Sequence, residues 1–264
     1  MDESKKESKS LVQFGDFSIE EAEREMMEME KLSGNSDYMK LVVGRNIVRL
    51  LPPKDTSGHS PFQIVMEHFL RLPGAQRPLV FACPTVTAKT KCPACEHAAR
   101  LRASGNPADR ELAYDMSAKF RVYCNVINRK EPEKGPQILP IGKMIYEQLL
   151  TIRKDEDAGG NYSDPLNGFD IIIERKGTGK NDTEYAVHGS RKQSPLHPDS
   201  SQAEEWIATQ ADLARFARSR SYEELLASIR KEGGMVGGSA QQAAPARPAT
   251  RTAQADLDDD DLKF

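Results

Sequence analysis

A group of three cysteines and one histidine constrains the fold of this chain more than any other feature of its sequence. The group has the spacing H-x14-C-x8-C-x2-C and consists of His68, Cys83, Cys92 and Cys95. Tetrahedral zinc takes four nitrogen or sulfur ligands, and a Cys-x2-Cys pair directs two thiolates at one ion. Because the protein fills all four positions, none remains open for a catalytic water. The sequence therefore predicts one structural Zn²⁺, which orders a proline-rich segment with little core of its own.

Other interpretations of these residues stay open at the level of sequence. Cys92 and Cys95 could form a redox pair, but a thioredoxin-type βαβ context is missing and a third cysteine lies nearby. His68 has the strand parity of its apolar neighbours and could be a core histidine, in which case His97 or Cys124 would complete the ligand set. His97 is the better substitute because it follows the Cys pair by two residues. Cys124 instead has the parity of a buried apolar thiol.

The apolar pattern and the charge of the chain narrow its class. No apolar run reaches the roughly 20 residues that a membrane helix needs, and the polar residues 1–6 do not resemble a signal peptide. We therefore expect a cytoplasmic protein without membrane contacts, whose thiols stay reduced. Residues 37–232 carry a net charge of +4, between −5 over residues 1–36 and −2 over residues 233–264. A basic body of this kind suits a polyanionic partner.

Composition divides the chain into three regions. Residues 1–36 are predicted to be an N-terminal arm with a short, methionine-rich amphipathic helix, which packs on its own core or contacts a neighbouring protomer. Residues 37–232 are predicted to be the core, with a zinc subdomain at about 66–104. Residues 233–264 are predicted to be a flexible linker of Gly, Ala, Pro and Gln that ends in an acidic tail, because such a composition buries no core.

The core region alternates between strand and helix patterns. Period-two apolar runs flanked by turn residues predict strands over residues 41–51, 62–72, 120–127 and 136–141, and a hairpin over residues 169–176 and 184–191. Helical patterns predict four helices. The first ends near residue 104 and the second covers residues 145–152. The third contains Trp206, Leu213 and Ala217, and the fourth begins with the capping box of Ser221 and Glu224. We expect an α+β fold, mainly β, built on a closed or partly open five-stranded antiparallel barrel with flanking helices.

Strand alternation places cations beside aromatic residues on faces that we expect to be exposed. Lys119, Arg121 and Tyr123 share one such face with Asn125. On a surface for single-stranded nucleic acid, cations meet phosphates and rings stack on bases, with roughly 1–3 kcal/mol per stacked base. The alternative is an ordinary solvated surface. The candidate contacts are Arg45, Arg49, Phe69, Arg71, Lys119, Arg121, Tyr123, Lys176, Tyr185, Arg191 and Lys192.

Two catalytic patterns do not fit this sequence. A zinc deaminase needs H-x-E before P-C-x-x-C, and His68 is not followed by such a Glu. A phosphate-binding loop needs Gly five residues before Gly179 and Ser or Thr after Lys180, but Glu174 and Asn181 occupy these positions. We therefore expect no enzymatic activity. The alternatives are an accessory to a zinc-dependent nucleic-acid enzyme, which predicts an open metal position and clustered carboxylates, and a zinc-ribbon adaptor that binds only protein.

An ordered set of motifs in this sequence resembles the T-even-type bacteriophage single-stranded DNA-binding (helix-destabilising) protein family. The motifs are VGRNIVRLLPP (43–53), the four zinc ligands, YCNVI (123–127) followed by EPEKG (131–135), SYEELL (221–226) and the acidic tail. The resemblance covers residues 38–232 and the C-terminus. It implies an oligonucleotide-binding (OB) barrel with an inserted zinc subdomain and DNA in a basic, aromatic-lined cleft. It also implies cooperative coating of single strands during phage replication, recombination and repair in the infected bacterial cell.

The two ends of the chain bear on its expected partners. In the resembled family a basic N-terminal segment promotes protomer contacts, whereas here Lys5, Lys6 and Lys9 are diluted by acidic residues. The C-terminal acidic run looks like the tips through which strand-coating proteins bind partner enzymes, such as a polymerase, a helicase or its loader, or a recombinase. A terminal phenylalanine adds an apolar anchor to such a tip. The residues that would bind these partners are Asp258, Asp259, Asp260, Asp261 and Phe264.

Overall fold

The computed structural model describes residues 38–54, 60–72, 75–155, 160–179 and 182–233. These residues belong to one compact unit that begins at Tyr38. Every helix within these ranges is too short or too polar to span a lipid bilayer. The predicted N-terminal helix and the acidic tail lie outside the described residues.

The strands of the described chain form one antiparallel sheet of seven strands, and this sheet is open. They are β1 (Gly44–Leu50), β2 (Phe62–Leu70), β3 (Leu79–Ala82), β4 (Lys119–Asn128), β5 (Pro136–Ile141), β6 (Phe169–Lys176) and β7 (Glu184–Gln193). The order is β3-β2-β4-β1-β6-β7, and β5 pairs with the other edge of β4. The expected mixture of a mainly antiparallel sheet and helices is confirmed. The sheet is open, with a path that ends at β3 and β7, so a closed five-stranded barrel is not confirmed.

The described helices are α2 (Pro84–Thr87), α3 (Pro93–Ala103), α4 (Pro107–Asp115), α5 (Lys143–Lys154), α6 (Ser200–Thr209) and α7 (Tyr222–Gly233), with 3₁₀ turns η1 (Pro132–Lys134) and η2 (Leu213–Ala217). The segments predicted near residue 104 and over residues 145–152 correspond to α3 and α5. The predicted capping box precedes α7: Glu224 N–H donates to Ser221 Oγ at 3.2 Å, and Ser221 N–H donates to Glu224 Oε2 at 2.8 Å. Helices α2 and α4 have no counterpart in the sequence prediction.

The prediction of a single helix from Trp206 to Ala217 is wrong, because the chain leaves the helix at Gln210. Its backbone there has φ −56° and ψ 149°. The Gln210 side chain donates to Pro52 O at 3.0 Å and accepts from Asn125 Nδ2 at 3.1 Å. These hydrogen bonds fasten the break to the sheet, so α6 and η2 are separate elements.

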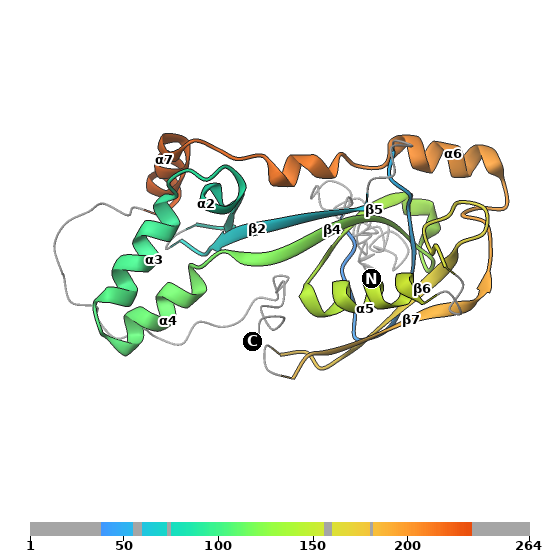
Figure 1. The fold of residues 1–264 in the computed structure, drawn as a ribbon, viewed down its shortest axis with the longest axis horizontal. Coiled ribbons are helices and arrows are strands. Elements are labelled where there is room, and N and C mark those ends of the chain that lie inside the picture. The colour runs from blue at the N-terminus through green and yellow to red at the C-terminus, as the bar shows by residue number, and fades with distance from the viewer. Residues whose placement is uncertain (1–37, 55–59, 73–74, 156–159, 180–181, 234–264) are drawn as a thin grey trace, which may run out of the picture. The chain divides into compact units, whose positions relative to one another are not determined.

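Strand β4 organises the sheet because it is long enough to pair with several others. Along one edge, its first half pairs with β2, where Val122 lies opposite Ile64, and its second half pairs with β1, where Val126 lies opposite Leu50. Strand β5 pairs along the other edge. Figure 1 shows β2 and β4 running side by side from the region of α2, α3 and α7 to the region of α5. The two strands thus connect two parts of the same sheet.

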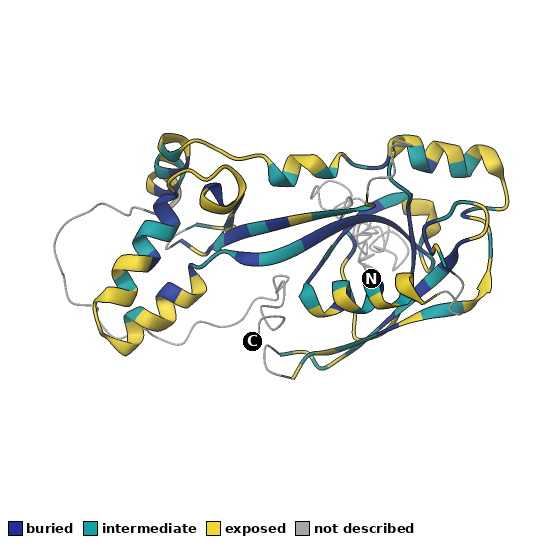
Figure 2. Ribbon diagram, in the orientation of Figure 1, coloured by how far each residue is buried: buried dark blue, intermediate teal, exposed yellow. Residues whose placement is uncertain are grey.

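Two clusters of buried residues form cores towards the two ends of the β2–β4 pair, and Figure 2 shows the buried positions as dark blue segments of the ribbon. The larger core lies between the sheet and α5, and its members include Val48, Leu50, Val122, Cys124, Val126, Leu149, Phe169 and Ile171. The other surrounds the cysteines of the predicted zinc site and includes Leu70, Phe81, Cys83, Cys92, Ala98, Met116, Leu225 and Ile229. The second core combines large side chains such as Leu70, Phe81 and Met116 with three alanines and two of the cysteines.

Candidate metal centre and nucleic-acid interface

His68, Cys83, Cys92 and Cys95 come together at one point, as a group within the described residues that could hold one metal ion. Their ligand atoms all lie within 4.8 Å of one another. His68 Nε2 is 3.4 Å from both Cys92 Sγ and Cys95 Sγ, and the Sγ atoms of Cys83 and Cys95 are 3.5 Å apart. Three thiols and one imidazole nitrogen are a ligand set that suits tetrahedral coordination of a single ion.

The ligands are positioned by the ends of short elements. His68 lies on β2, and Cys83 follows β3 directly as the N-cap residue of α2. Cys92 is the N-cap residue of α3, and Cys95 lies in the first turn of that helix. A proline follows each N-cap cysteine at the first helical position, where its fixed φ suits the helix start. The β2–β3 hairpin and the first turn of α3 thus supply all four ligand atoms.

Met116 fixes the tautomer of the His68 ring. The Nδ1 atom of His68 is 2.8 Å from Met116 O. A carbonyl oxygen only accepts, so Nδ1 carries the hydrogen and donates it, and Nε2 directs its lone pair at the cysteines. Hydrogen bonds of this kind orient metal-binding histidines. His68 is fully buried, and its ring therefore has the orientation and the tautomer that a metal ligand requires.

The thiols of the group favour a thiolate. The pKa of the Cys83 thiol lies well below its ordinary value because Cys92 and Cys95 donate hydrogen bonds to its sulfur. The thiolate is the form of cysteine that binds metal. The same contact with Cys83 raises the pKa of the Cys92 thiol, so the ionised sulfur of the group is assigned to Cys83.

The alternative ligands lie elsewhere. His97 Nδ1 accepts a hydrogen bond from Arg100 Nη2 at 3.3 Å on the outside of α3. The pKa of His97 is lowered, mainly by partial burial and also by the positive charge of Arg100. Cys124 is buried in the larger core, and its thiol is 3.6 Å from Leu139 O. The described structure thus places His68, and neither of the substitutes, beside the three cysteines.

The expectation that one face of β4 is exposed is wrong. Lys119, Tyr123 and Asn125 are 5%, 5% and 4% exposed. The Tyr123 ring stacks on Phe216 of η2 with 3.9 Å between centroids, and its hydroxyl donates to Glu67 Oε2 at 2.6 Å. The turn η2 covers this face of the sheet, which strand alternation alone does not reveal.

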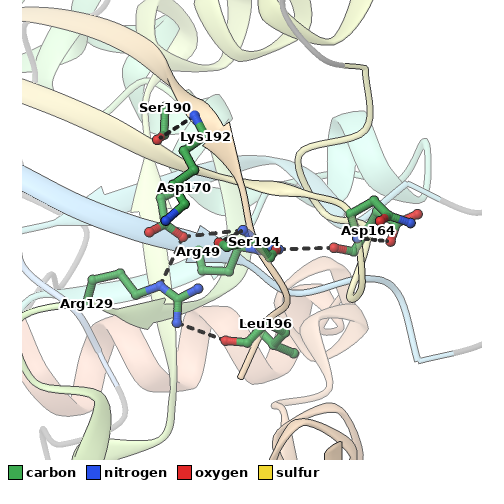
Figure 3. Close-up of polar contacts among 9 residues, drawn as sticks. Arg49, Arg129, Asp164, Asp170, Ser190, Lys192, Ser194 and Leu196 are labelled. Atoms are coloured by element: carbon green, nitrogen blue, oxygen red, sulfur yellow. Dashed lines mark hydrogen bonds and ion pairs between the residues drawn. The ribbon is translucent and has the colours of Figure 1, made fainter. Parts of the chain in front are cut away.

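The expectation that Arg49 is exposed is also wrong, since its side chain has no exposed surface. Figure 3 shows Arg49 and Arg129 converging on Asp170. The Arg49 guanidinium is 3.4 Å from Asp170 Oδ1 and donates to the carbonyl oxygens of Asp164 and Ser194. Arg129 Nε donates to the same Asp170 Oδ1 at 2.9 Å. Arg49 therefore fastens β1 to β6 and to the segment after β7.

The other predicted DNA contacts are distributed over several elements. Arg71 and Phe69 lie together, with the guanidinium carbon 5.8 Å from the ring centroid. Arg121 is 3.7 Å from Glu67 Oε1. The predicted contacts that are exposed are Arg45, Arg71, Lys176, Arg191 and Lys192, and those that are half-buried are Phe69, Arg121 and Tyr185. The predicted partner-binding residues Asp258 to Asp261 and Phe264 lie outside the described residues.

A face that carries aromatic rings lies on the other side of β2 and β4. Phe62 and Phe120 are half-buried and contact Tyr146 of α5, with ring centroids 5.2 Å and 6.2 Å apart. Ile64, which is 46% exposed, and Met66 share the strand face of Phe62. We call these five residues the aromatic face.

Sequence reasoning missed the aromatic face because alternation shows which residues share a face and not which face is covered. Phe120 has the parity of Val122 and Val126, which are fully buried, but it lies at the start of β4, where it packs only partly against the larger core. The signal that could have found it is the recurrence of rings at Phe62 and Phe120 on two paired strands.

The family model described as gp32 DNA binding protein like matches residues 43–236 of this chain. The matched range contains the metal ligands, the aromatic face and every described strand. A search of the curated proteins found no match. Because the matched range covers well over half of the sequence, the chain belongs to the gp32-like family of DNA-binding proteins.

Proposed function

We propose that this protein binds single-stranded DNA without sequence preference and coats it. The observation that carries the proposal is the aromatic face, in a chain that belongs to a DNA-binding family. Unpaired bases offer their ring faces for stacking, whereas a duplex keeps them inside the base stack. Stacking on aromatic side chains tolerates any base and contributes roughly 1–3 kcal/mol per base.

Phosphate contacts are assigned to cations that lie on the same sheet and on α5. Lys143 is three residues before Tyr146 and therefore neighbours it on the surface of α5. The exposed cations of β1, β6 and β7 are Arg45, Lys176, Arg191 and Lys192. Contacts to the phosphate backbone position a strand and carry no sequence information, which agrees with binding that does not depend on sequence. Phe69 and Arg71, on the opposite face of β2, form a second candidate surface.

The part of the sheet nearest α5 is the proposed counterpart of an OB barrel. It consists of β1, β4, β5, β6 and β7, which surround the larger core. The resemblance to strand-binding proteins and this five-strand group support the assignment. The part with β3, α2 and α3 would then be the inserted metal subdomain, which the β2–β4 pair joins to the barrel counterpart.

We infer that the metal is Zn²⁺ and that its role is structural. His68, Cys83, Cys92 and Cys95 supply the nitrogen and sulfur donors that zinc prefers, and together they fill a tetrahedral coordination sphere. When bound, the ion would supply a cross-link between β2, the end of β3 and the start of α3. A site closed in this way supports a binding protein rather than a zinc enzyme.

The biological role follows from the family and from the ends of the chain. We propose that the protein acts in phage DNA replication, recombination and repair, in the cytoplasm of an infected bacterium. Neighbouring protomers would contact one another along the strand. The acidic residues Asp258 to Asp261 and the apolar Phe264 would bind replication and recombination enzymes. The composition of the tail and the family resemblance support this assignment.

Fluorescence titration of an oligothymidine with single ring substitutions tests the DNA surface. Phe120→Leu and Tyr146→Leu should each weaken binding by about 5-fold to 100-fold, which is the loss of one stacked base. The comparison variant is Phe69→Leu, which removes a half-buried ring from the second candidate surface; if the strand binds the aromatic face, its affinity should stay within about twofold of wild type. Urea unfolding of each variant checks that the fold is retained.

The same titration separates the two candidate surfaces. If Phe69→Leu weakens binding and the other two substitutions do not, the strand binds the opposite face and the proposal for the aromatic face is wrong. If a duplex of equal length binds as tightly as the single strand, stacking on unpaired bases is not the basis of recognition.

A further inference from the structure

Helix α7 packs against the same core as the candidate metal site. Leu225 and Ile229 are 0% and 3% exposed, and both belong to the core that includes Cys92, Ala94 and Ala98. Leu225 and Ile229 are four residues apart, so they form one apolar stripe along α7. The buried side chains of α7 among the described residues therefore depend on the packing around α3.

A polar contact places α7 next to a metal ligand. The Tyr222 hydroxyl donates to Glu96 Oε2 at 2.9 Å. Glu96 directly follows the ligand Cys95 in the first turn of α3. The start of α7 is thus hydrogen-bonded to the residue beside a ligand, and its next two turns place Leu225 and Ile229 in the same core as Ala94 and Ala98 of α3.

The first turn of α3 begins at Cys92, and its first helical residue is Pro93. Its N-cap residue Cys92 makes no side-chain capping hydrogen bond within the described structure. A helix start without such a cap is less stable than a capped one. Coordination through Cys92 and Cys95 would replace that cap, since it would fix both ends of the first turn. The surface on which α7 packs would therefore be ordered by the metal.

We propose that Tyr222, Glu96 and Leu225 are positioning residues of the metal site, and that metal binding and α7 packing stabilise each other. This inference rests on the proposed metal site. Coupling between two binding events is reciprocal: if metal strengthens the attachment of α7, then α7 strengthens the binding of metal by the same factor.

Hydrogen exchange of the full chain, with and without zinc, tests one direction of the coupling. Removal of zinc by a chelator should reduce the protection of residues 222–233 by at least about tenfold. Residues 200–209 of α6 are an internal control, because Trp206 packs with Leu51, Ile127 and Leu196 in a separate core. Equal protection of residues 222–233 in both states overturns the proposal, as does an equal loss in residues 200–209, which would indicate general unfolding.

Zinc affinity, measured by competition with a chromophoric chelator, tests the other direction. Leu225→Ala should weaken zinc binding by about tenfold, whereas Leu196→Ala, an equally buried leucine in the separate core, should change it by less than about twofold. Equal effects of the two substitutions overturn the coupling.

The thiolate-to-cobalt absorption of the Co²⁺-loaded protein provides a second readout. If Leu225→Ala fails to fold, Tyr222→Phe removes only the hydroxyl that contacts Glu96 and should shift the same affinity in the same direction by a smaller factor. An unchanged affinity in Tyr222→Phe excludes the Tyr222–Glu96 contact as a positioning contact. A wild-type chain that binds neither Zn²⁺ nor Co²⁺ overturns the metal site as well as the coupling, which distinguishes the two failures.

Discussion

Glu67 is a buried carboxylate in the centre of the β2–β4 pair, where it is 4% exposed. Burial raises its pKa above the ordinary value of 4.5, although the hydrogen bond from Tyr123 and the charge of Arg121 act in the opposite direction. A raised pKa means that the folded protein holds this proton more tightly than the unfolded chain does. Glu67 therefore contributes stability below the unfolded pKa and loses that contribution as pH rises through the folded pKa.

Substitution Glu67→Gln should expose this dependence. The glutamine side chain does not titrate, so the unfolding free energy of the variant relative to wild type should rise as pH increases from about 4.5, by about 1.4 kcal/mol per unit of pKa elevation. Urea unfolding over a range of pH measures the difference. Glu133→Gln, at an exposed position of η1, controls for the loss of a carboxylate at the protein surface. Parallel curves for wild type and Glu67→Gln would show that the carboxylate is not perturbed.

At the residue scale, the clustering of His68 with the three cysteines was predictable, whereas the exposure of the residues proposed to contact nucleic acid was only partly so. The spacing of His68 and the three cysteines indicates a metal site, because few other functions combine three cysteines and one histidine at these intervals. For strands, alternation correctly grouped Lys119, Tyr123 and Asn125 on one face. It gave the wrong exposure for them, because η2, about 90 residues further along the chain, covers that face.

At the scale of elements, strands were predicted better than helices. Strand-forming runs bounded by turn residues found β1, β2, β4, β5 and the β6–β7 hairpin. Helices α2 and α4 escaped because they are short and carry few apolar residues: one buried residue is found in each. The break between α6 and η2 depends on hydrogen bonds from Gln210 to distant residues, which no local pattern contains.

The capping box of α7 was read from the sequence, and its contribution can be measured. Ser221→Ala removes the acceptor for Glu224 N–H and should lower the free energy of unfolding by about 1 kcal/mol. Ser219→Ala, two residues earlier at an exposed position outside the helix, should have an effect of less than about 0.5 kcal/mol. Urea unfolding of both variants provides the comparison. Equal midpoints for the two would mean that α7 is held by its apolar face alone.

At the scale of the whole molecule, charge separates along the chain even though the total is only −3. In the proposed function the basic core region binds a polyanion, the DNA strand. The acidic tail of the same chain would compete with that strand for the cations of the core. Neither the open sheet nor its pairing order was predictable from the sequence, because pairing partners such as β1 and β6 are over a hundred residues apart. The division of charge between the core and the tail, in contrast, can be counted from the sequence, and it predicts that removal of the tail changes DNA binding.

Deletion of residues 252–264 removes five acidic residues and one lysine, which changes the net charge of the chain from −3 to +1. If the tail competes with DNA for the core cations, the deletion should tighten oligothymidine binding at low salt by about tenfold, or roughly 1.4 kcal/mol. The gain should shrink as salt rises, because screening weakens the tail's competition. The plot of log affinity against log salt should therefore be steeper for the truncated chain, since more counterions are released on binding.

Phe264→Ala keeps every charge of the tail and is the matched control. It should bind oligothymidine like wild type at each salt concentration, because competition through charge does not need the ring. Its effect should instead appear in partner binding, for which the ring is the proposed apolar anchor. If the truncated chain and wild type have the same affinity at low salt, the tail does not compete for the DNA site. If Phe264→Ala reproduces the effect of the deletion on DNA binding, then an apolar contact of the tail, and not its charge, weakens the binding of DNA to the core.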